Sequence, residues 1–210
     1  NLKCSGVIFT RDINNNAPYY KINYDDRSGS SDSIKWLKKQ LQTYFLEASV
    51  YVESDLLGAA RALYGKEPGL VGILGTGSNI GFYNGDKLFF KKPSLGYILG
   101  DEGSGNYLGQ LFLSAYFRNE LSKNVSENIS LNRKEVLKRI YEEPYPNRYL
   151  ASFAPFIFKY RTESDIAIII QKNFIDWIEK CVLPYDENKE LSVVGSIAFY
   201  FNIELRSVVK

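Results

Sequence analysis

The sequence predicts an α/β protein, and three observations support this fold class. Short runs rich in β-branched and aromatic residues alternate with longer stretches in which apolar residues recur every three or four positions. Glycine turns follow two buried-type strands, at 75–79 and at 195–196. Hydrophobic residues make up 45% of the 210 residues, which is enough to build a core. Strands that alternate with helices are typical of folds in which helices cover a sheet.

The first part of the chain contains two predicted helices. Asp32 or Ser33 is a suitable N-cap for a helix over 32–45, where the apolar residues have helical spacing. Ser54 is a suitable cap for a second helix over 54–65. Both helices therefore begin at residues whose side chains can accept from free backbone N–H groups.

The strands are short, and one pair forms a predicted hairpin. Asn84 and Gly85 separate two strand-like runs, which is the strongest short-range signal for a hairpin. Strands are expected at 6–10, 22–26, 48–52, 70–75, 80–85, 86–90 and 191–195.

The C-terminal part is predicted to be mostly helical. Pro184 would end a long helix that starts at Ser164. The stretch 94–104 is expected to be a loop because glycines interrupt it. Helices are expected at 105–122, 132–143, the later part of 144–161, 164–184 and from 203 onwards.

The bulk composition excludes several classes of protein. The net charge of +2 gives no electrostatic reason to expect a nucleic-acid partner or an acidic membrane surface. No apolar run is long enough for a membrane span, and no signal peptide is recognisable. Cys4 and Cys181 are too far apart in sequence to suggest a disulfide framework or zinc, so a reducing cytoplasm is the expected location. The absence of Met and His predicts that some residues of the protein are missing from this sequence.

The glycine turn at 75–78 has two interpretations. Its backbone N–H groups could form a concavity for phosphate, with Thr76 and Ser78 as added hydroxyl donors. Alternatively, Gly75 and Gly77 could serve only a tight hairpin that requires positive φ. A dinucleotide fingerprint is excluded because a hairpin, and not a helix, follows the turn.

Three further residues each have one functional and one purely structural interpretation. Asp101, in the stretch "GDEGSG", could cap the helix that follows it or could bind hydroxyl groups of a ligand. Gly195 ends a strand, where it could admit a phosphate or a flat ring or could serve packing alone. Asp55 starts a helix after a predicted strand, so it could be catalytic or could only interact with the helix dipole.

Taken together, these stretches resemble a known family. The segments "VESDLLGAARALYGKEPGLVGILGTGSN", "PSLGYILGDEGSG" and "VGSIAFYF" are similar to the N-acetylglucosamine kinase-like branch of the BadF/BadG-type ATPases, in the actin/sugar-kinase/Hsp70 superfamily. The resemblance runs from about residue 48 to the end. It implies two ribonuclease-H-like domains around a central cleft, here an incomplete first domain over 1–68 and a second over 69–210.

The resemblance also implies roles for individual residues in an ATP-dependent sugar kinase that uses Mg²⁺. Asp55 matches the catalytic carboxylate. Nucleotide-binding positions are implied for Gly75, Thr76, Gly77, Ser78, Gly195 and Ser196, and sugar-binding positions for Asp101, Gly96 and Asn14. No metal ligand is identified. A homodimer is left open.

Two departures from the family pattern keep alternatives open. Leu95 stands where the animal N-acetylglucosamine kinases have a tryptophan near the sugar, so a related amino sugar or hexose is also an expected substrate. The first phosphate loop of the family is not found in the sequence. The alternatives are a degenerate protein that binds sugar or nucleotide without catalysis, and a dehydratase-activating ATPase of the BadF type.

Overall fold

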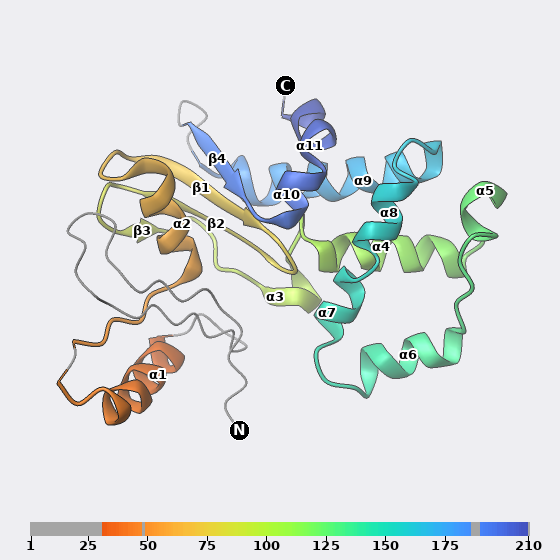
Figure 1. Ribbon diagram of the computed structural model, residues 1–210. Coiled ribbons are helices and arrows are strands. Elements are labelled where there is room, and N and C mark those ends of the chain that lie inside the picture. The colour runs from red at the N-terminus through yellow and green to blue at the C-terminus, as the bar shows by residue number, and fades with distance from the viewer. Residues whose placement is uncertain (1–30, 48, 186–189, 210) are drawn as a thin grey trace. The chain divides into compact units, whose positions relative to one another are not determined.

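The computed structural model of the protein describes residues 31–47, 49–185 and 190–209 (Figure 1). The chain consists of two compact units, Asn1–Gly58 and Ala59–Lys210. The strands predicted at 6–10 and 22–26, and the candidate residue Asn14, lie outside the described residues.

The first unit contains helix α1 (Ser31–Tyr44) and the first turn of α2 (Asp55–Tyr64). The predicted caps Asp32 and Ser33 are wrong, because α1 already begins at Ser31. The cap of α2 is confirmed, since the Ser54 hydroxyl oxygen accepts from the Leu57 N–H at 3.2 Å.

The strand predicted at 48–52 is wrong for the residues that the structure describes there. Residues 49–52 adopt no regular structure, and Tyr51 is largely exposed. The valine and tyrosine side chains that favour a strand stabilise one only when a neighbouring strand pairs with it. No described strand pairs with this segment.

The second unit contains one mixed sheet in the order β3-β2-β1-β4, which confirms the α/β class. Its strands are β1 (Gly69–Leu74), β2 (Ser78–Tyr83), β3 (Leu88–Phe89) and β4 (Leu191–Val194). The hairpin between β2 and β3 is confirmed, and the Asn84 N–H donates to the Lys87 carbonyl at 3.1 Å across it.

The pairing of β1 decides where the glycine turns lie. Strand β1 runs antiparallel to β2, with Leu74 opposite Ser78, and parallel to β4, with Ile73 opposite Val194. Parallel strands end at the same edge of a sheet. The turns that follow β1 and β4 therefore leave the sheet side by side.

Short helices make up most of the remaining chain (Figure 1). Their bounds are α3 Gly96–Leu99, α4 Gly105–Phe117, α5 Lys123–Ser126, α6 Arg133–Tyr141, α7 Pro146–Ala151, α8 Ala154–Lys159, α9 Ser164–Trp177, α10 Ser196–Tyr200 and α11 Asn202–Val208. Helix α3 forms where a loop was expected. The expected helix over 164–184 changes to a π-helical turn at Ile178–Val182, beyond the end of α9.

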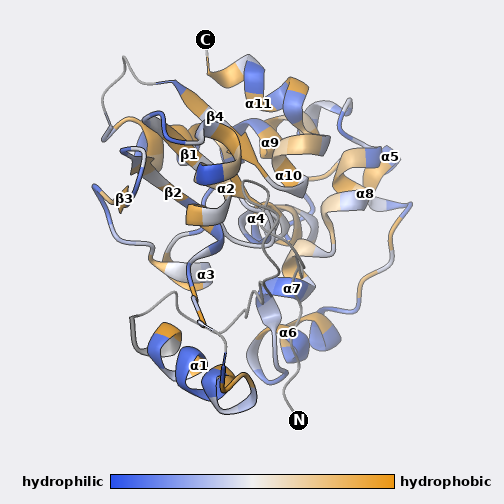
Figure 2. Cartoon of the chain, turned by 60° about the vertical axis from the view of Figure 1, so that its left-hand side comes forward, coloured by the Kyte–Doolittle hydropathy of each residue, from blue (hydrophilic) through white to orange (hydrophobic). Residues whose placement is uncertain are grey.

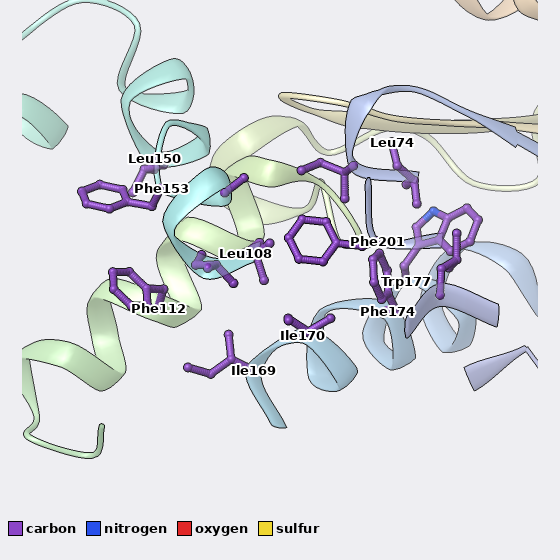
Figure 3. Packing of buried hydrophobic residues seen from close by; sticks show 14 of the residues in the cluster. Leu74, Leu108, Phe112, Leu150, Phe153, Ile169, Ile170, Phe174, Trp177 and Phe201 are labelled. Atoms are coloured by element: carbon purple, nitrogen blue, oxygen red, sulfur yellow. The ribbon is translucent and has the colours of Figure 1, made fainter. Parts of the chain in front are cut away.

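An aromatic and aliphatic core holds the helices of this unit together (Figure 3). The Phe112 ring of α4 lies 5.7 Å from the Phe153 ring, and the Phe174 ring of α9 lies 6.5 Å from the Phe201 ring, measured between centroids. Trp177 is fully buried against the sheet, where a Cβ at Gly72 would lie 3.1 Å from its indole. Aromatic pairs in this geometry add about 0.5–1.5 kcal/mol each beyond the burial of their area.

The polarity of the helices follows their place in this core. In Figure 2, β4 and α9 are mainly orange, whereas α6 is largely blue. This difference matches burial, because four isoleucine and aromatic positions of α9 are fully covered and only Val136 is buried in α6. Those α9 positions are Ile166, Ile170, Phe174 and Trp177.

Candidate functional site

The turn between β1 and β2 is fixed to the first residues of α4. The Gly105 N–H donates to the Gly75 carbonyl at 2.8 Å, and the Asn106 N–H donates to the Thr76 carbonyl at 3.0 Å. Within the turn, the Gly75 N–H donates to the Gly77 carbonyl at 2.9 Å. The turn is thus held by backbone contacts that leave its side chains free for another role.

The glycines of this turn are not there to allow positive φ. Neither Gly75 nor Gly77 has a positive φ, so the interpretation of a hairpin that needs glycine for its backbone angles is wrong. A Cβ at Gly77 would lie 2.8 Å from Oδ2 of Asp101, whereas a Cβ at Gly75 would meet no atom within 4 Å. Gly75 therefore leaves open space beside the turn, although its own N–H and carbonyl are both hydrogen-bonded. Open space beside a glycine backbone is one of the features that an anion-binding loop requires.

Asp101 faces this turn and does not cap α4. The cap is Ser104, whose hydroxyl oxygen accepts from the Tyr107 N–H at 3.1 Å, so the interpretation of Asp101 as an N-cap is wrong. Asp101 adopts a left-handed backbone angle, φ 59°, which is uncommon for a residue other than glycine. Strained backbone of this kind persists where the surrounding structure holds it.

The charge of Asp101 is partly compensated. Burial raises the pKa of the Asp101 carboxyl, the Ser78 backbone N–H that donates to it has the opposite effect, and the neighbouring Glu102 raises the pKa further. The net shift is upward. The site thus holds a carboxylate that has lost part of its hydration, and the backbone of Ser78 offsets only part of this loss.

The turn after β4 lies against the end of β1. Gly195 has φ 110°, and a Cβ there would lie 2.3 Å from the Leu74 carbonyl oxygen, so only glycine fits. Ser196 follows as the exposed first residue of α10. A Cβ at Gly105 would lie 3.3 Å from the Ile197 side chain and 3.4 Å from the Gly75 carbonyl oxygen, which places both turns beside the start of α4.

A cavity of about 260 Å³ opens beside Ser78 and Asp101. Its lining also contains an ion pair, since Lys180 Nζ lies 3.2 Å from Oε1 of Glu102. The lining residues are Ser78, Asn79, Ile80, Lys92, Pro93, Ser94, Leu95, Gly100, Asp101, Glu102, Trp177, Lys180, Cys181 and Tyr185. The lining of the cavity thus combines polar groups at the turn with apolar side chains and an ion pair.

Cys181 is a protonated thiol in this wall. Burial, with Glu102 as the next contribution, raises its pKa to about 11. A thiol with this pKa is a poor nucleophile and a poor metal ligand at neutral pH, because both roles need the thiolate.

Helix α4 also carries positioning residues that the sequence analysis missed. The Asn106 side chain is fully buried, and its Nδ2 donates to the Tyr97 carbonyl at 3.0 Å. Gln110 Nε2 donates to the same carbonyl at 2.9 Å. The turn that starts at Gly96 is therefore fixed to the helix that also holds Thr76. Two amides four residues apart on an otherwise apolar helix were the signal in the sequence.

The structure brings together most of the sequence-predicted site residues. Residues 75–78, Asp101, Gly195 and Ser196 lie at one edge of the sheet, and Gly96 is linked to them through Asn106. Asp55 lies in the first unit, where its Oδ1 accepts from the Leu56 N–H at 2.7 Å.

The described residues offer no metal centre and no membrane span. No group of three or more His, Cys, Asp or Glu side chains within residues 31–47, 49–185 and 190–209 is arranged to hold a metal ion. In the same part of the chain, no helix has the length and apolar character to cross a bilayer.

Solved structures of two bacterial proteins resemble the chain. The putative N-acetylglucosamine kinase from Porphyromonas gingivalis is 34% identical, with a TM-score of 0.81 over 86% of this chain and 66% of that chain. The putative N-acetylglucosamine kinase from Chromobacterium violaceum is 19% identical, with a TM-score of 0.59 over 80% of this chain and 64% of that chain, which shows a shared fold alone. This chain thus spans slightly less than two thirds of either protein. No protein-family model and no curated protein sequence matches it.

Proposed function

We propose that this chain, which is N-acetylglucosamine kinase-like in sequence and fold, is part of an ATP-dependent sugar kinase. Its substrate would be N-acetylglucosamine or a related amino sugar or hexose, phosphorylated in the cytoplasm. The resemblance to the Porphyromonas gingivalis protein supports the kinase class. The local geometry supports the location of the site.

The observation that carries this proposal is the open space at Gly75, in a turn that the half-buried carboxylate of Asp101 contacts at Gly77. A Cβ at Gly75 would meet no atom within 4 Å, and the turn has no need of glycine for its φ angle there. Phosphate binding explains a residue without a side chain at this position, because the anion needs close access to the backbone N–H groups of the turn. The Gly75 N–H itself donates to the Gly77 carbonyl, so the phosphate would be bound by other N–H groups of the turn. Asp101 then supplies an acceptor for sugar hydroxyls in the cavity that it lines together with Ser78.

The two turns at the sheet edge have separate roles in this proposal. Residues 75–78 would bind the phosphates, with Thr76 and Ser78 as hydroxyl donors. Gly195 and Ser196 would lie against the adenosine, since the Gly195 backbone is bare and follows a strand. The cavity beside Ser78 would hold the sugar, with Gly96 fixing the turn that borders it and Asn14 as a further contact.

Asp55 would act as the general base. It would accept the proton of the attacking sugar hydroxyl as that oxygen forms a bond to the γ-phosphorus and the bond to the leaving ADP oxygen breaks. Its place at the start of α2, where Ser54 caps the helix, gives it a fixed backbone. A positioned base contributes about 10²–10⁴-fold to the rate.

Mg²⁺ is expected with ATP because it neutralises charge that develops on the transferred phosphoryl group. The described residues provide no cluster that fits a metal ion, so no residue of this chain is assigned to it. For the whole protein we propose two ribonuclease-H-like domains around a cleft, the first over 1–68 and the second over 69–210.

Two alternatives differ in their chemistry. A degenerate relative would bind sugar or nucleotide without transferring phosphate. A dehydratase activator of the BadF type would need paired thiolates for an iron–sulfur cluster. The raised pKa of Cys181 argues against a ligand role for this thiol.

The test is ATP consumption by the full-length protein in the presence of Mg²⁺ and a panel of sugars. The panel contains N-acetylglucosamine, N-acetylmannosamine, glucosamine and glucose. We expect at least one of these sugars to raise ATP consumption, with the phosphorylated sugar identified by mass spectrometry. Nucleotide binding without any phosphorylated product would favour the degenerate relative, and an anaerobic absorption spectrum of a cluster would favour the activator.

A further inference from the structure

The loop that carries Asp101 is attached through the next residue, Glu102, to the turn that follows α9. Lys180 Nζ lies 3.2 Å from Oε1 of Glu102, and Cys181 Sγ lies 3.9 Å from Oε2, within reach of a weak S–H···O contact. Both partners belong to the π-helical turn Ile178–Val182, and turns of this kind occur often at functional sites. Both oxygens of Glu102 are thus occupied, whereas Asp101 makes no ion pair with a described residue.

The backbone conformation of this loop depends on its attachments. Asp101 and Gly103 both have left-handed backbone angles, φ 59° and φ 80°. For Asp101 this angle is unfavourable, and it persists where the surrounding structure holds it. Gly103 packs against the end of α9, since a Cβ there would lie 2.8 Å from Cγ of Trp177. The backbone of Gly103 and the side chain of Glu102 therefore fix the loop to neighbouring parts of one helical segment.

The importance of the Glu102–Lys180 pair follows from the burial of Glu102. Its side chain is 12% exposed, whereas that of Lys180 is 52% exposed. A fully exposed ion pair would contribute little to the structure. A largely buried carboxylate that loses its cation, in contrast, leaves an uncompensated charge, which is costly unless the carboxylate moves into water. Such a movement of Glu102 would displace the backbone of its neighbour Asp101.

We propose that Lys180 is a positioning residue of the sugar cavity: its ion pair with Glu102 holds the loop so that the Asp101 carboxylate stays in the cavity. This inference rests on the proposed function and gives the π-helical turn a role in sugar affinity. All three residues line the cavity beside Ser78. Lys180 acts on the sugar through Glu102, and not by direct contact.

Steady-state kinetics of the full-length protein with its sugar substrate test this inference. We expect Lys180→Met and Glu102→Gln each to raise KM for the sugar about tenfold and to leave kcat within about threefold, because substrate binding is weakened while the reacting groups remain. Affinity for the non-hydrolysable ATP analogue AMP-PNP, in the presence of Mg²⁺, should change by less than about twofold. The charge-reversed double variant, Lys180→Glu with Glu102→Lys, should bring KM back to within about threefold of the wild type.

Lys172→Met is the matched control for the loss of one ion pair. Lys172 Nζ lies 3.0 Å from Oδ2 of Asp176, and these side chains are 55% and 12% exposed, but both residues belong to α9 and neither lines the cavity. Its KM for the sugar should change by less than about twofold. An equal rise of KM in this control overturns the inference. A rise in Lys180→Met together with an unchanged KM in Glu102→Gln also overturns it, since Lys180 would then contact the sugar directly.

Hydrogen exchange of the ligand-free protein provides a second measurement that does not depend on catalysis. We expect the amides of residues 101–104 to exchange at least about threefold faster in Lys180→Met and Glu102→Gln than in the wild type, and at the wild-type rate in Lys172→Met. Unchanged exchange in the first two variants overturns the inference. Failure of the proposed function gives a different result: the wild type phosphorylates no sugar of the panel, while the difference in exchange persists and still supports the attachment of the loop.

Discussion

The Tyr107 hydroxyl donates a 2.6 Å hydrogen bond to Oδ2 of Asp176 and so joins the start of α4 to the end of α9. Lys172 Nζ lies 3.0 Å from the same oxygen. Burial alone would raise the pKa of Asp176, but the hydrogen bonds from Tyr107 and Lys172, together with the charge of Lys180, outweigh it and lower the pKa. Helix α4, which holds the turn at residues 75–78, is thus also attached to α9.

Removal of this contact should destabilise the fold. We expect Tyr107→Phe to lower the free energy of unfolding by about 1–2 kcal/mol at pH 7, because a buried acceptor loses one donor. Urea denaturation measures this change. Tyr200→Phe is the control, since the exposed Tyr200 hydroxyl makes no hydrogen bond to a described residue. An equal loss in both variants would contradict the role of the Tyr107 contact.

The same contact predicts a pH dependence. Since folding lowers the pKa of Asp176, its ionised form stabilises the protein above the unfolded pKa of about 3.9, and this stabilisation is lost as the pH falls through the lower folded value. The stability difference between wild type and Asp176→Asn should therefore shrink below pH 4. Thermal unfolding at pH 7 and pH 3 measures it, and a constant difference would contradict the prediction.

Substitution of Gly75 should separate binding from folding. We expect Gly75→Ala to leave the free energy of unfolding within about 1 kcal/mol of the wild type, because no atom meets the new Cβ and φ is not positive. Affinity for AMP-PNP should fall by about tenfold, because the methyl group blocks the open backbone. Isothermal titration calorimetry measures the affinity. Unchanged affinity would remove Gly75 from the phosphate site.

Substitution of Gly195, unlike that of Gly75, should destabilise the fold. A Cβ there would meet the Leu74 carbonyl oxygen, and φ 110° is strained for any L residue, so Gly195→Ala should cost at least about 2 kcal/mol of stability. Gly75→Ala serves as the matched control in urea denaturation. A Gly195→Ala protein as stable as this control would show that the turn can relax.

Asp55 should matter for turnover and not for nucleotide binding. We expect Asp55→Asn to lower turnover by at least about a hundredfold with little change in AMP-PNP affinity, as for a general base. Asp86→Asn, in the hairpin turn after β2, is the control for loss of one carboxylate. Nearly full activity of Asp55→Asn would remove this residue from the base role.

Cys181 should react slowly with alkylating reagents. With a pKa of about 11, on the order of one thiol in a thousand is ionised at pH 8. Mass spectrometry of the native protein after iodoacetamide treatment should show Cys181 largely unmodified, while urea-unfolded protein is fully alkylated. Rapid labelling of the native protein would contradict the half-buried, protonated state of this thiol.

The sequence predicted best those elements that local chemistry determines. Asn84–Gly85 specified the β2–β3 hairpin, and Ser54 specified the start of α2. The strand expected at 48–52 failed because pairing with a neighbour, and not residue type, decides whether a strand forms. Helix α3 was missed because its carbonyl at Tyr97 is held by side chains of α4, which is a tertiary contact.

The candidate site was also predictable from the sequence only in part. The glycines at 75–78 and at 195 were visible in the sequence, but the reason for each depends on its neighbours in space. Gly195 approaches the Leu74 carbonyl and Gly77 approaches Asp101, while a Cβ at Gly75 would meet no atom within 4 Å. These distinctions follow from the parallel pairing of β1 and β4, which periodicity alone does not determine.

The pairing of β1 with β4 also has a consequence for biosynthesis. The strands are neighbours in the sheet, yet all helices from α3 to α9 lie between them in the chain. Contacts between such distant segments form slowly, since a large loop must first close. A ribosome-bound chain that ends before β4 has the turn after β1, but it lacks β4 and the turn that follows β4. It would leave one side of β1 unpaired and open to aggregation until synthesis reaches that strand.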